Sequence, residues 1–419
     1  MVRIIKDKIR KLFITKHSSL FVNEAVDSAE IRNAIAYLLD EAIMREHLKV
    51  SDEDKKKVIS DLTDEFSGLG PIENLMKDLD ITEIMINGPE KVYVEKHGET
   101  TLSGVTFDNE QQLMALVYKI LAPTRRRVDE LYPYTDVSFK DGSRVNIIIP
   151  PLALNGPVIT IRKFSREIRQ IEDLVRLGTL DKRMGDFLVN CIRAKVNIIF
   201  SGATGSGKTT TVGVLSAYID PKERIVTIED TAELHLNQEH VVRLEARTPN
   251  IEGKGEVTIR ELFKNCLRMR PERIILGEIR SSEALDMLQA ICSGHTGSLA
   301  VLHANSPQEV IYRLETMILS SGVPISLAAI HRQIAAAVHL IVQQEQLLDG
   351  TRKVTHITQV NGMTEGQVNL EDLFVYDIES IDDKGKVKGS WKSSGIKPAF
   401  MNIFKKAGIN LGEQLFKKD

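Results

Sequence analysis

The spacing of apolar residues changes twice along the chain, which predicts three regions. Residues 28–66 carry one apolar stripe at helical spacing, and with residues 1–17 they predict a basic tail and a small helical bundle. Residues 67–165 combine short β-branched runs with an amphipathic helix and predict a compact α+β domain. From residue 166 to the end, strands and helices alternate, and this pattern predicts an α/β domain with a parallel sheet and a C-terminal subdomain.

The α+β region is expected to contain five short strands, at 81–86, 91–95, 135–139, 143–149 and 158–162, and a helix at 111–121. In the α/β region we expect four parallel strands, at Asn197–Phe200, Arg224–Ile228, Arg273–Leu276 and Ser298–Leu302. The helices between and after them are expected at 208–219, 259–268, 283–291 and 306–317. Later strands are expected at 338–342, 354–360 and 368–374, and a last helix near 398–407.

A glycine-rich turn links the first expected strand of the α/β region to its helix. Residues Gly202–Thr209 follow the pattern G-x-x-x-x-G-K-T, preceded by a β-branched and aromatic run. Glycines let successive N–H groups point into one concavity that suits phosphate oxygens. Lys208 would meet the β- and γ-phosphates, and the Thr209 hydroxyl would help to hold Mg²⁺. The sequence therefore predicts an ATP site at Gly202, Ala203, Thr204, Gly205, Ser206, Gly207, Lys208, Thr209 and Thr210; the alternative is a turn that binds nothing.

Polar residues follow each of the other expected strands. Glu229 and Asp230 follow the second strand, Glu278 the third and His303 the fourth. Ligands of open parallel sheets bind outside the carboxyl ends of the strands, where the glycine-rich turn also lies. We expect Glu229 to orient or deprotonate an attacking water and Glu278 to approach Mg²⁺ through a water; the opposite assignment stays open. His303 either contacts the γ-phosphate or is an ordinary hydrogen-bonded histidine.

Phosphoryl transfer benefits from an arginine, and the sequence offers four candidates: Arg144, Arg162, Arg270 and Arg280. Arg280 closely follows the strand that ends at Glu278 and would act within its own domain. Arg144 and Arg162 belong to the preceding domain, so they would need domain closure or a subunit interface to reach a γ-phosphate. The alternative for each is a structural salt bridge.

Composition narrows the class of protein further. Hydrophobic residues make up 42% and charged residues 27% of the chain, and the formal net charge is −3. These values indicate a globular protein without an electrostatic reason to bind nucleic acid. The three cysteines, Cys191, Cys266 and Cys292, lack disulfide or zinc-ligand spacing and are expected to be buried thiols. No signal peptide or membrane-spanning run is recognisable, which indicates a cytoplasmic protein.

Residues 1–17 alternate basic and apolar side chains near helical spacing. One interpretation is a basic amphipathic segment that touches an anionic membrane surface or a partner. The preferred alternative is a frayed, solvated terminus.

Four stretches resemble the signature motifs of the type II/type IV secretion ATPases. In chain order, these stretches look like the Walker A motif (Gly202–Thr209), the Asp box (Arg224–Leu234), the atypical Walker B motif (Arg273–Arg280) and the His box (Gly294–Asn305) of that superfamily. Further stretches are similar to the CpaF-like motors of tight-adherence (Flp) pili: 68–71, 83–88, 127–130, 141–146, 150–154 and 395–398. The paired-cysteine zinc site of pilus-extension and type II members has no counterpart in this sequence.

The resemblance implies a homohexameric ring with a RecA-like P-loop NTPase motor domain at the cytoplasmic face of the inner membrane. It implies Glu229 as catalytic glutamate and Arg144 and Arg162 as arginines that reach the nucleotide. ATP hydrolysis would drive a membrane platform that assembles, and possibly retracts, a pilus. The alternatives are an ATPase of a conjugative type IV or type II secretion system, a nucleotide-gated adaptor with little turnover, and a DNA translocase, which the acidic balance disfavours.

Overall fold

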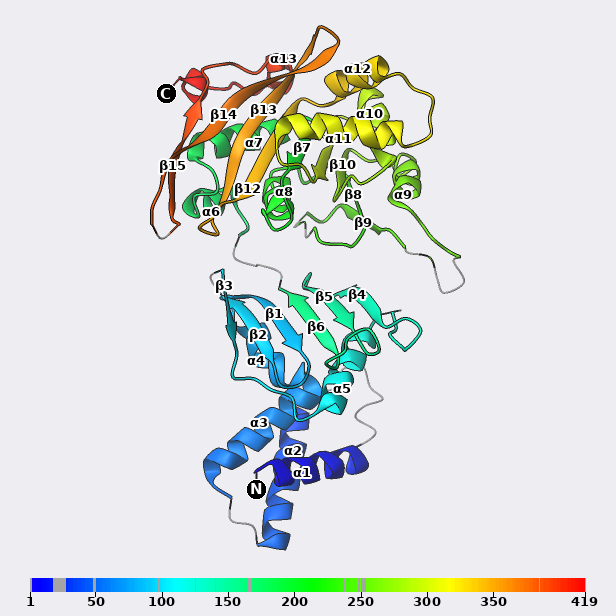
Figure 1. Ribbon diagram of the computed structural model, residues 1–419, viewed down its shortest axis with the longest axis vertical. Helices are drawn as coiled ribbons and strands as arrows, with labels where there is room; N and C mark the ends of the chain where they lie inside the picture. Colours follow the sequence, from blue (N-terminus) through cyan, green and yellow to red (C-terminus); the bar gives the residue numbers. More distant parts are fainter. Residues whose placement is uncertain are drawn as a thin grey trace. The chain divides into compact units, whose positions relative to one another are not determined.

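The fold is available as a computed structural model, which describes residues 2–17, 28–47, 50–96, 98–124, 126–139, 141–163, 168–234, 236, 238–247, 249, 254–383 and 385–418. The chain divides into two compact units, Met1–Ser165 and Arg166–Asp419 (Figure 1). Each unit has its own hydrophobic cores and is described by itself.

The first unit begins with three helices that share one core. They are α1 (Val2–Lys16), α2 (Ser28–Glu46) and α3 (Asp52–Ser67). The Ser51 side chain caps α3 by accepting a hydrogen bond from the Asp54 N–H group. The shared core is formed by apolar side chains at helical spacing: Ile5, Ile9, Phe13, Ile31, Ile35, Leu38, Leu39, Ala42, Val58 and Leu62.

The expectation of a frayed N-terminal tail is wrong for the described residues of α1. Its apolar side is buried against α2 and α3, so that face is not available to enter a lipid surface. Three of its basic side chains pair with acidic residues of α2 and α3: Lys6 with Asp61, Lys8 with Glu46, and Lys16 with Glu41. The spacing that suggests a membrane-surface helix therefore serves packing within the bundle.

Arg10 connects this bundle to the rest of the first unit. Its Nε lies 2.6 Å from a carboxylate oxygen of Glu65 on α3, and its Nη2 lies 3.1 Å from Asp108. Asp108 comes shortly before α5 (Glu110–Leu121), the helix that covers the following sheet. A single guanidinium thus joins a bundle helix to the α+β part.

The α+β part contains a six-stranded antiparallel sheet in the order β3-β2-β1-β6-β5-β4. The strands are β1 (Ile81–Asn87), β2 (Val92–Lys96), β3 (Glu99–Leu102), β4 (Tyr134–Ser138), β5 (Arg144–Ile148) and β6 (Val158–Arg162). Apolar residues of α5 pack against one face, and the short helices η2 (Gly70–Ile72) and α4 (Glu73–Lys77) precede the sheet. The five expected strands are present within about two residues, whereas β3 is not predicted because all four of its residues are exposed.

The second unit contains a nine-stranded mixed sheet in the order β15-β14-β13-β12-β7-β11-β10-β8-β9. Its strands are β7 (Ile198–Ser201), β8 (Ile225–Glu229), β9 (Val241–Glu245), β10 (Arg273–Leu276), β11 (Leu299–Leu302), β12 (Leu340–Gln346), β13 (Arg352–Thr364), β14 (Gln367–Ile381) and β15 (Val387–Ser393). The strands from β12 to β9 in this order are parallel, which confirms the predicted parallel arrangement. β12 to β15 are joined by antiparallel pairing.

Helices cover both faces of the parallel strands, so successive residues of β7 enter two different cores. Ile198 and Phe200 pack in the core that contains residues of α7 (Lys182–Arg193) and α8 (Lys208–Ser216). Ile199 packs in the core of the opposite face. The helices there are α9 (Ile259–Cys266), α10 (Glu283–Cys292), α11 (Pro307–Leu319) and α12 (Leu327–Ala337). The remaining helices of the unit are α6 (Ile171–Arg176), α13 (Met401–Lys406) and η3 (Glu413–Phe416).

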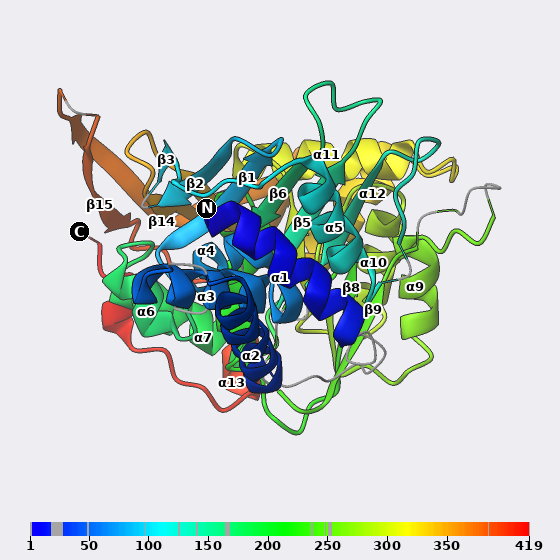
Figure 2. The same ribbon diagram turned by 90° about the horizontal axis from the view of Figure 1, so that it is seen from below.

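Two features of this sheet depart from the sequence prediction. The edge strand β9 is not predicted, because its residues are only half buried and show no clear apolar alternation. β13 and β14 are several residues longer than predicted, and Figure 2 shows β14 and β15 projecting together from the sheet. The last five residues of β14 are all exposed, so no hydrophobic pattern marks them as a strand.

Two further predictions concern the burial of the cysteines and the absence of a membrane-spanning helix. Cys191 and Cys266 are buried, as predicted, and burial raises the pKa of the Cys266 thiol to about 12. Cys292 is exposed, so the expectation of a buried thiol is wrong there: the residue ends α10 at a turn. None of the helices in the described ranges combines the length and the apolar character that a membrane span requires.

A buried polar network joins the starts of three neighbouring strands of the second unit. The Asn197 side chain accepts from the Gly297 N–H group at 2.7 Å and donates to the Ala337 carbonyl at 2.8 Å. The backbone N–H of Asn197 donates to Nδ1 of His339 at 3.1 Å. Burial lowers the pKa of His339 to about 4, so the ring is neutral at pH 7 and can accept this bond.

We predict that this histidine makes the second unit acid-sensitive. Because its folded pKa lies below the unfolded value near 6.5, the stability that it contributes is complete above pH 6.5 and is lost as pH falls toward 4. Between pH 7 and pH 5 the free energy of unfolding should fall by about 2 kcal/mol from this group.

The measurement is urea unfolding followed by fluorescence of Trp391, the single tryptophan of the chain. His339→Gln, which cannot take up this proton, should lose about 2 kcal/mol less than the wild type between pH 7 and pH 5. His240→Gln, at an exposed position, serves as the control and should keep the wild-type dependence. Equal pH dependence of all three proteins would contradict the assignment.

Candidate functional site

The glycine-rich turn lies between β7 and α8, and three of its glycines have positive φ angles. These are +149° at Gly202, +80° at Gly205 and +95° at Gly207, which is the N-cap of α8. A Cβ atom at Gly202 would lie 2.0 Å from the backbone oxygen of Gln344, and one at Gly207 would lie 2.8 Å from the Gln344 side chain. Both the backbone conformation and the close approach of β12 therefore require glycine.

Lys208, the first residue of α8, turns its buried ammonium group back onto the turn. Nζ donates to the carbonyl oxygens of Gly202 at 2.9 Å and Ala203 at 2.7 Å, and it lies 3.5 Å from Nδ1 of His303. The Ser206 N–H group donates to the same Ala203 oxygen at 3.3 Å. Two donors of the turn thus converge on one point beside the N-terminus of a helix.

A chain of ionisable side chains, called here the charged chain, runs from Lys208 across the carboxyl ends of the neighbouring strands. His303 follows β11, and its Nε2 lies 3.2 Å from a carboxylate oxygen of Glu278, which follows β10. The other oxygen of Glu278 lies 2.6 Å from Nη2 of Arg280. Nη1 of Arg280 lies 2.7 Å from Asp230, which follows β8. The structure therefore brings together four residues that the sequence placed at one edge of the sheet, and it adds Arg280, which the sequence offered as an arginine of the same domain.

The electrostatic setting of His303 follows from this position. Burial lowers the pKa of the His303 ring, and the positive charge of Lys208 lowers it further. The carboxylate of Glu278 and the backbone of Gly202 act in the opposite direction but do not outweigh the first two causes. A neutral imidazole at pH 7 therefore separates the cation of Lys208 from the anion of Glu278.

Glu229, the last residue of β8, is buried and shapes the segment that follows it. Its Oε2 accepts hydrogen bonds from the backbone N–H groups of Glu233 at 2.6 Å and Leu234 at 2.8 Å. Its side chain also lies against the neighbouring strand end, where a Cβ at Gly277 would be 2.7 Å from Glu229 Cγ. The glycine that precedes Glu278 thus makes room for the side chain of Glu229.

The sequence prediction missed residues of β12 and β13 that support the turn from the other side. Gln344 is buried, and its Oε1 accepts a hydrogen bond from the Thr211 hydroxyl at 2.8 Å. Gln343 accepts a hydrogen bond from the Ser201 hydroxyl at the end of β7. Arg352 donates through Nε to the Gly205 carbonyl at 2.8 Å. Two consecutive glutamines that directly follow the apolar run Leu340–Val342 of β12 are the signal that points to such a role.

Arg144 and Arg162 belong to the first unit. They lie opposite each other on the neighbouring antiparallel strands β5 and β6, and Arg162 also faces Glu83 on β1. Like charges directly opposite on a sheet are unfavourable unless an anion compensates them. Glu83, on the other side of Arg162, places one negative charge next to this pair.

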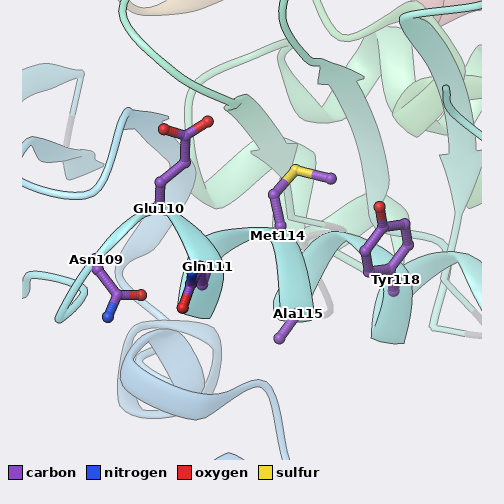
Figure 3. A pocket seen from close by; sticks show the side chains of 6 residues that line it. All are labelled: Asn109, Glu110, Gln111, Met114, Ala115 and Tyr118. Atoms are coloured by element: carbon purple, nitrogen blue, oxygen red, sulfur yellow. The ribbon is translucent and has the colours of Figure 1, made fainter. Parts of the chain in front are cut away.

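A cavity of about 730 Å³ lies on α5 of the first unit (Figure 3). Glu110, Met114 and Tyr118, each one helical turn apart, contribute to its lining together with Asn109, Gln111 and Ala115. No residue of the glycine-rich turn or of the charged chain lines it, so it is not the candidate site. Within the part of the chain that the structure describes, no group of three or more His, Cys, Asp or Glu side chains is arranged to hold a metal ion.

Comparison with known proteins assigns the family. A family model described as "Type II/IV secretion system protein" matches residues 65–373, more than half of the chain. The chain belongs to this family. The match begins near the end of α3 and ends within β14, so it includes the six-stranded sheet, the glycine-rich turn and all four strand ends that carry the candidate residues.

Individual relatives are similar over much of their length. A putative conjugal transfer protein of Mycobacterium tuberculosis, Rv3659c, is 31% identical over 328 residues, covering 77% of this chain and 92% of the relative. The type IV secretion system protein PtlH of Bordetella pertussis is 36% identical over 264 residues, covering 57% and 77%. The crystal structure of the pilus retraction motor PilT with bound ADP shares the fold, with a TM-score of 0.52 at 21% identity over 70% of this chain and 83% of that one.

We predict that Gly202→Ala destabilises the second unit by about 2–4 kcal/mol, because a left-handed backbone and an overlap with β12 are imposed together. Urea unfolding followed by Trp391 fluorescence measures this change. Ala203→Ser, at the neighbouring exposed position, is the matched control and should stay within about 0.5 kcal/mol of the wild type. A Gly202→Ala protein as stable as the wild type would show that β12 yields easily at this point.

Proposed function

We propose that the protein is an ATP-hydrolysing motor of a type II/IV secretion or pilus machine. The observation that carries this proposal is the charged chain that starts at Lys208 of the glycine-rich turn and runs through His303, Glu278 and Arg280 to Asp230. Such an arrangement suits phosphoryl transfer, in which positioning and charge stabilisation supply most of the catalysis. Family membership and the named relatives support the same conclusion.

The residues of the turn fit a nucleoside triphosphate. The glycine conformations, the N-terminus of α8 and the ammonium group of Lys208 together favour phosphate oxygens. The hydroxyl of Ser206 is buried and has no hydrogen-bond partner among the described residues, so it is a donor available to a bound group. In this proposal Gly202, Ala203, Thr204, Gly205, Gly207 and Thr210 complete the phosphate site.

Thr209 and Glu278 fit a role at Mg²⁺. Thr209 follows Lys208 in the first turn of α8, where its hydroxyl is a natural magnesium ligand, and Glu278 would approach the ion through a water. A bound Mg²⁺ neutralises charge on the phosphates during transfer. Because Glu278 is already paired with Arg280 and His303, its carboxylate is held in one place before any ligand arrives.

Glu229 is proposed to orient or deprotonate the attacking water, and His303 to contact the γ-phosphate. Arg280 would stabilise charge from within the unit, while Arg144 and Arg162 would come from the first unit of the same or a neighbouring subunit. In this proposal the second unit is a RecA-like motor domain within a homohexameric ring, the assembly that the CpaF-like resemblance implies. The ring would lie at the cytoplasmic face of the inner membrane and move a membrane platform of a Flp-type pilus.

We predict that Lys208→Ala and Glu229→Gln each lower the steady-state ATPase rate of the full chain by a factor of about 100 or more, because charge stabilisation and water activation are lost. Glu278→Gln should lower it similarly. Lys222→Ala, at an exposed position outside the site, is the control and should leave the rate unchanged. Activity that survives Lys208→Ala or Glu229→Gln would contradict the assigned site.

Equilibrium binding of ATP to the same variants separates a motor from an adaptor. A motor loses turnover in Glu229→Gln while it still binds ATP. Tight ATP binding by the wild type without turnover, even with its membrane partners present, would instead favour a nucleotide-gated adaptor.

A further inference from the structure

Arg352 makes a charge-assisted contact with the glycine-rich turn from a distant part of the sequence. It is the first residue of β13, and its Nε lies 2.8 Å from the carbonyl oxygen of Gly205. Its Cδ lies 3.2 Å from the position that a Cβ of Gly207 would occupy. A guanidinium is charged at any pH that the folded protein meets, and bonds from charged donors are about twice as strong as neutral ones.

This contact determines how one peptide group of the turn is oriented. In a trans peptide the carbonyl and the following N–H point in opposite directions. Because Arg352 holds the Gly205 carbonyl on the outer side, the Ser206 N–H points inward, where it donates to the Ala203 oxygen at 3.3 Å. Lys208 Nζ donates to that same oxygen at 2.7 Å. A phosphate oxygen that took the place of this carbonyl would meet both donors at once.

Hydrogen bonds order the turn between β12 and β13, which directly precedes Arg352. The Leu347 N–H donates to the Thr351 carbonyl at 2.8 Å, and the Asp349 carboxylate accepts from the Thr351 N–H at 3.0 Å and from Val387 of β15 at 3.1 Å. Burial raises the pKa of Asp349, but hydrogen bonds from the Thr351 hydroxyl and from these N–H groups outweigh burial and lower it, so the carboxylate stays ionised. The turn between β12 and β13 is therefore also bonded to β15, the edge strand at the other side of the sheet from β9.

We propose that Arg352 is a positioning residue of the nucleotide site, which presets the Gly205–Ser206 peptide so that the turn is ready for the phosphates before a nucleotide binds. This inference rests on the proposed function. Gln344 acts in the same direction from β12 through Thr211 and the close contact at Gly207. Since the Arg352 side chain is exposed, its removal costs little buried surface and should act on nucleotide binding more than on folding.

The test compares Arg352→Gln and Arg352→Lys with the wild type in the full chain. The probe is ADP with Mg²⁺, whose Kd is measured by titration with a fluorescent ADP analogue. Loss of a charge-assisted hydrogen bond that preorganises the turn should weaken ADP binding about tenfold in Arg352→Gln. Arg352→Lys, whose ammonium group can still reach the carbonyl, should recover most of this loss. Arg332→Gln, an exposed substitution on α12, is the matched control and should bind ADP like the wild type.

Urea unfolding without nucleotide, followed by Trp391 fluorescence, distinguishes positioning from a merely structural role. Positioning predicts an unchanged unfolding midpoint in Arg352→Gln together with weaker ADP binding. A lowered midpoint with wild-type affinity, or an unchanged Kd in a protein whose Lys208→Ala variant loses binding, would overturn the inference and leave the proposed function intact. Absence of ADP binding by the wild type itself would overturn both.

Discussion

The close approach of β12 to the glycine-rich turn is the constraint on which the rest of the second unit depends. The backbone oxygen of Gln344 lies 2.0 Å from where a Cβ of Gly202 would be, so no side chain fits between the two strands at this point. On one side, the glycine-rich turn therefore packs directly against β12. On its other side lie the carboxyl ends of β11, β10 and β8. Gly202, Gly205 and Gly207 have positive φ angles because the backbone must run close to β12 and then begin α8.

In the same region, side chains that carry positive charge alternate with side chains that carry negative charge. The buried ammonium group of Lys208 is satisfied by two carbonyl oxygens, and beyond it the groups follow in the order imidazole, carboxylate, guanidinium, carboxylate. Each charge therefore has a partner before any ligand binds, which avoids the cost of an isolated buried ion. A phosphate group at this site would replace the Gly202 and Ala203 carbonyl oxygens as partner of Lys208, while the Gly205–Ser206 peptide would keep the orientation that Arg352 gives it.

In the first unit, some positive charges are neutralised by carboxylates and others lie next to each other. Arg10 sits between the carboxylates of Glu65 on α3 and Asp108 before α5, so its charge is neutralised within the unit. Arg144 and Arg162, on the other hand, face each other across two strands, with Glu83 beside Arg162. Like charges opposite each other on adjacent strands repel, which is the physical difference between this pair and the neutralised Arg10.

The sequence by itself determined the alternation of strands and helices, the glycine-rich turn and the residues that end the central strands, because each depends on local spacing and on the shared edge of parallel strands. Glu278, His303, Asp230 and Lys208 could be grouped for that reason before any coordinates were known. Tertiary structure alone decided the contacts of β12 and β13, since Gln344 and Arg352 lie more than 130 residues from the turn that they support. It also decided that α1 packs into a bundle: an amphipathic, basic helix has the same spacing whether its apolar side meets lipid or protein, and only the burial of Ile9 and Phe13 distinguishes the two.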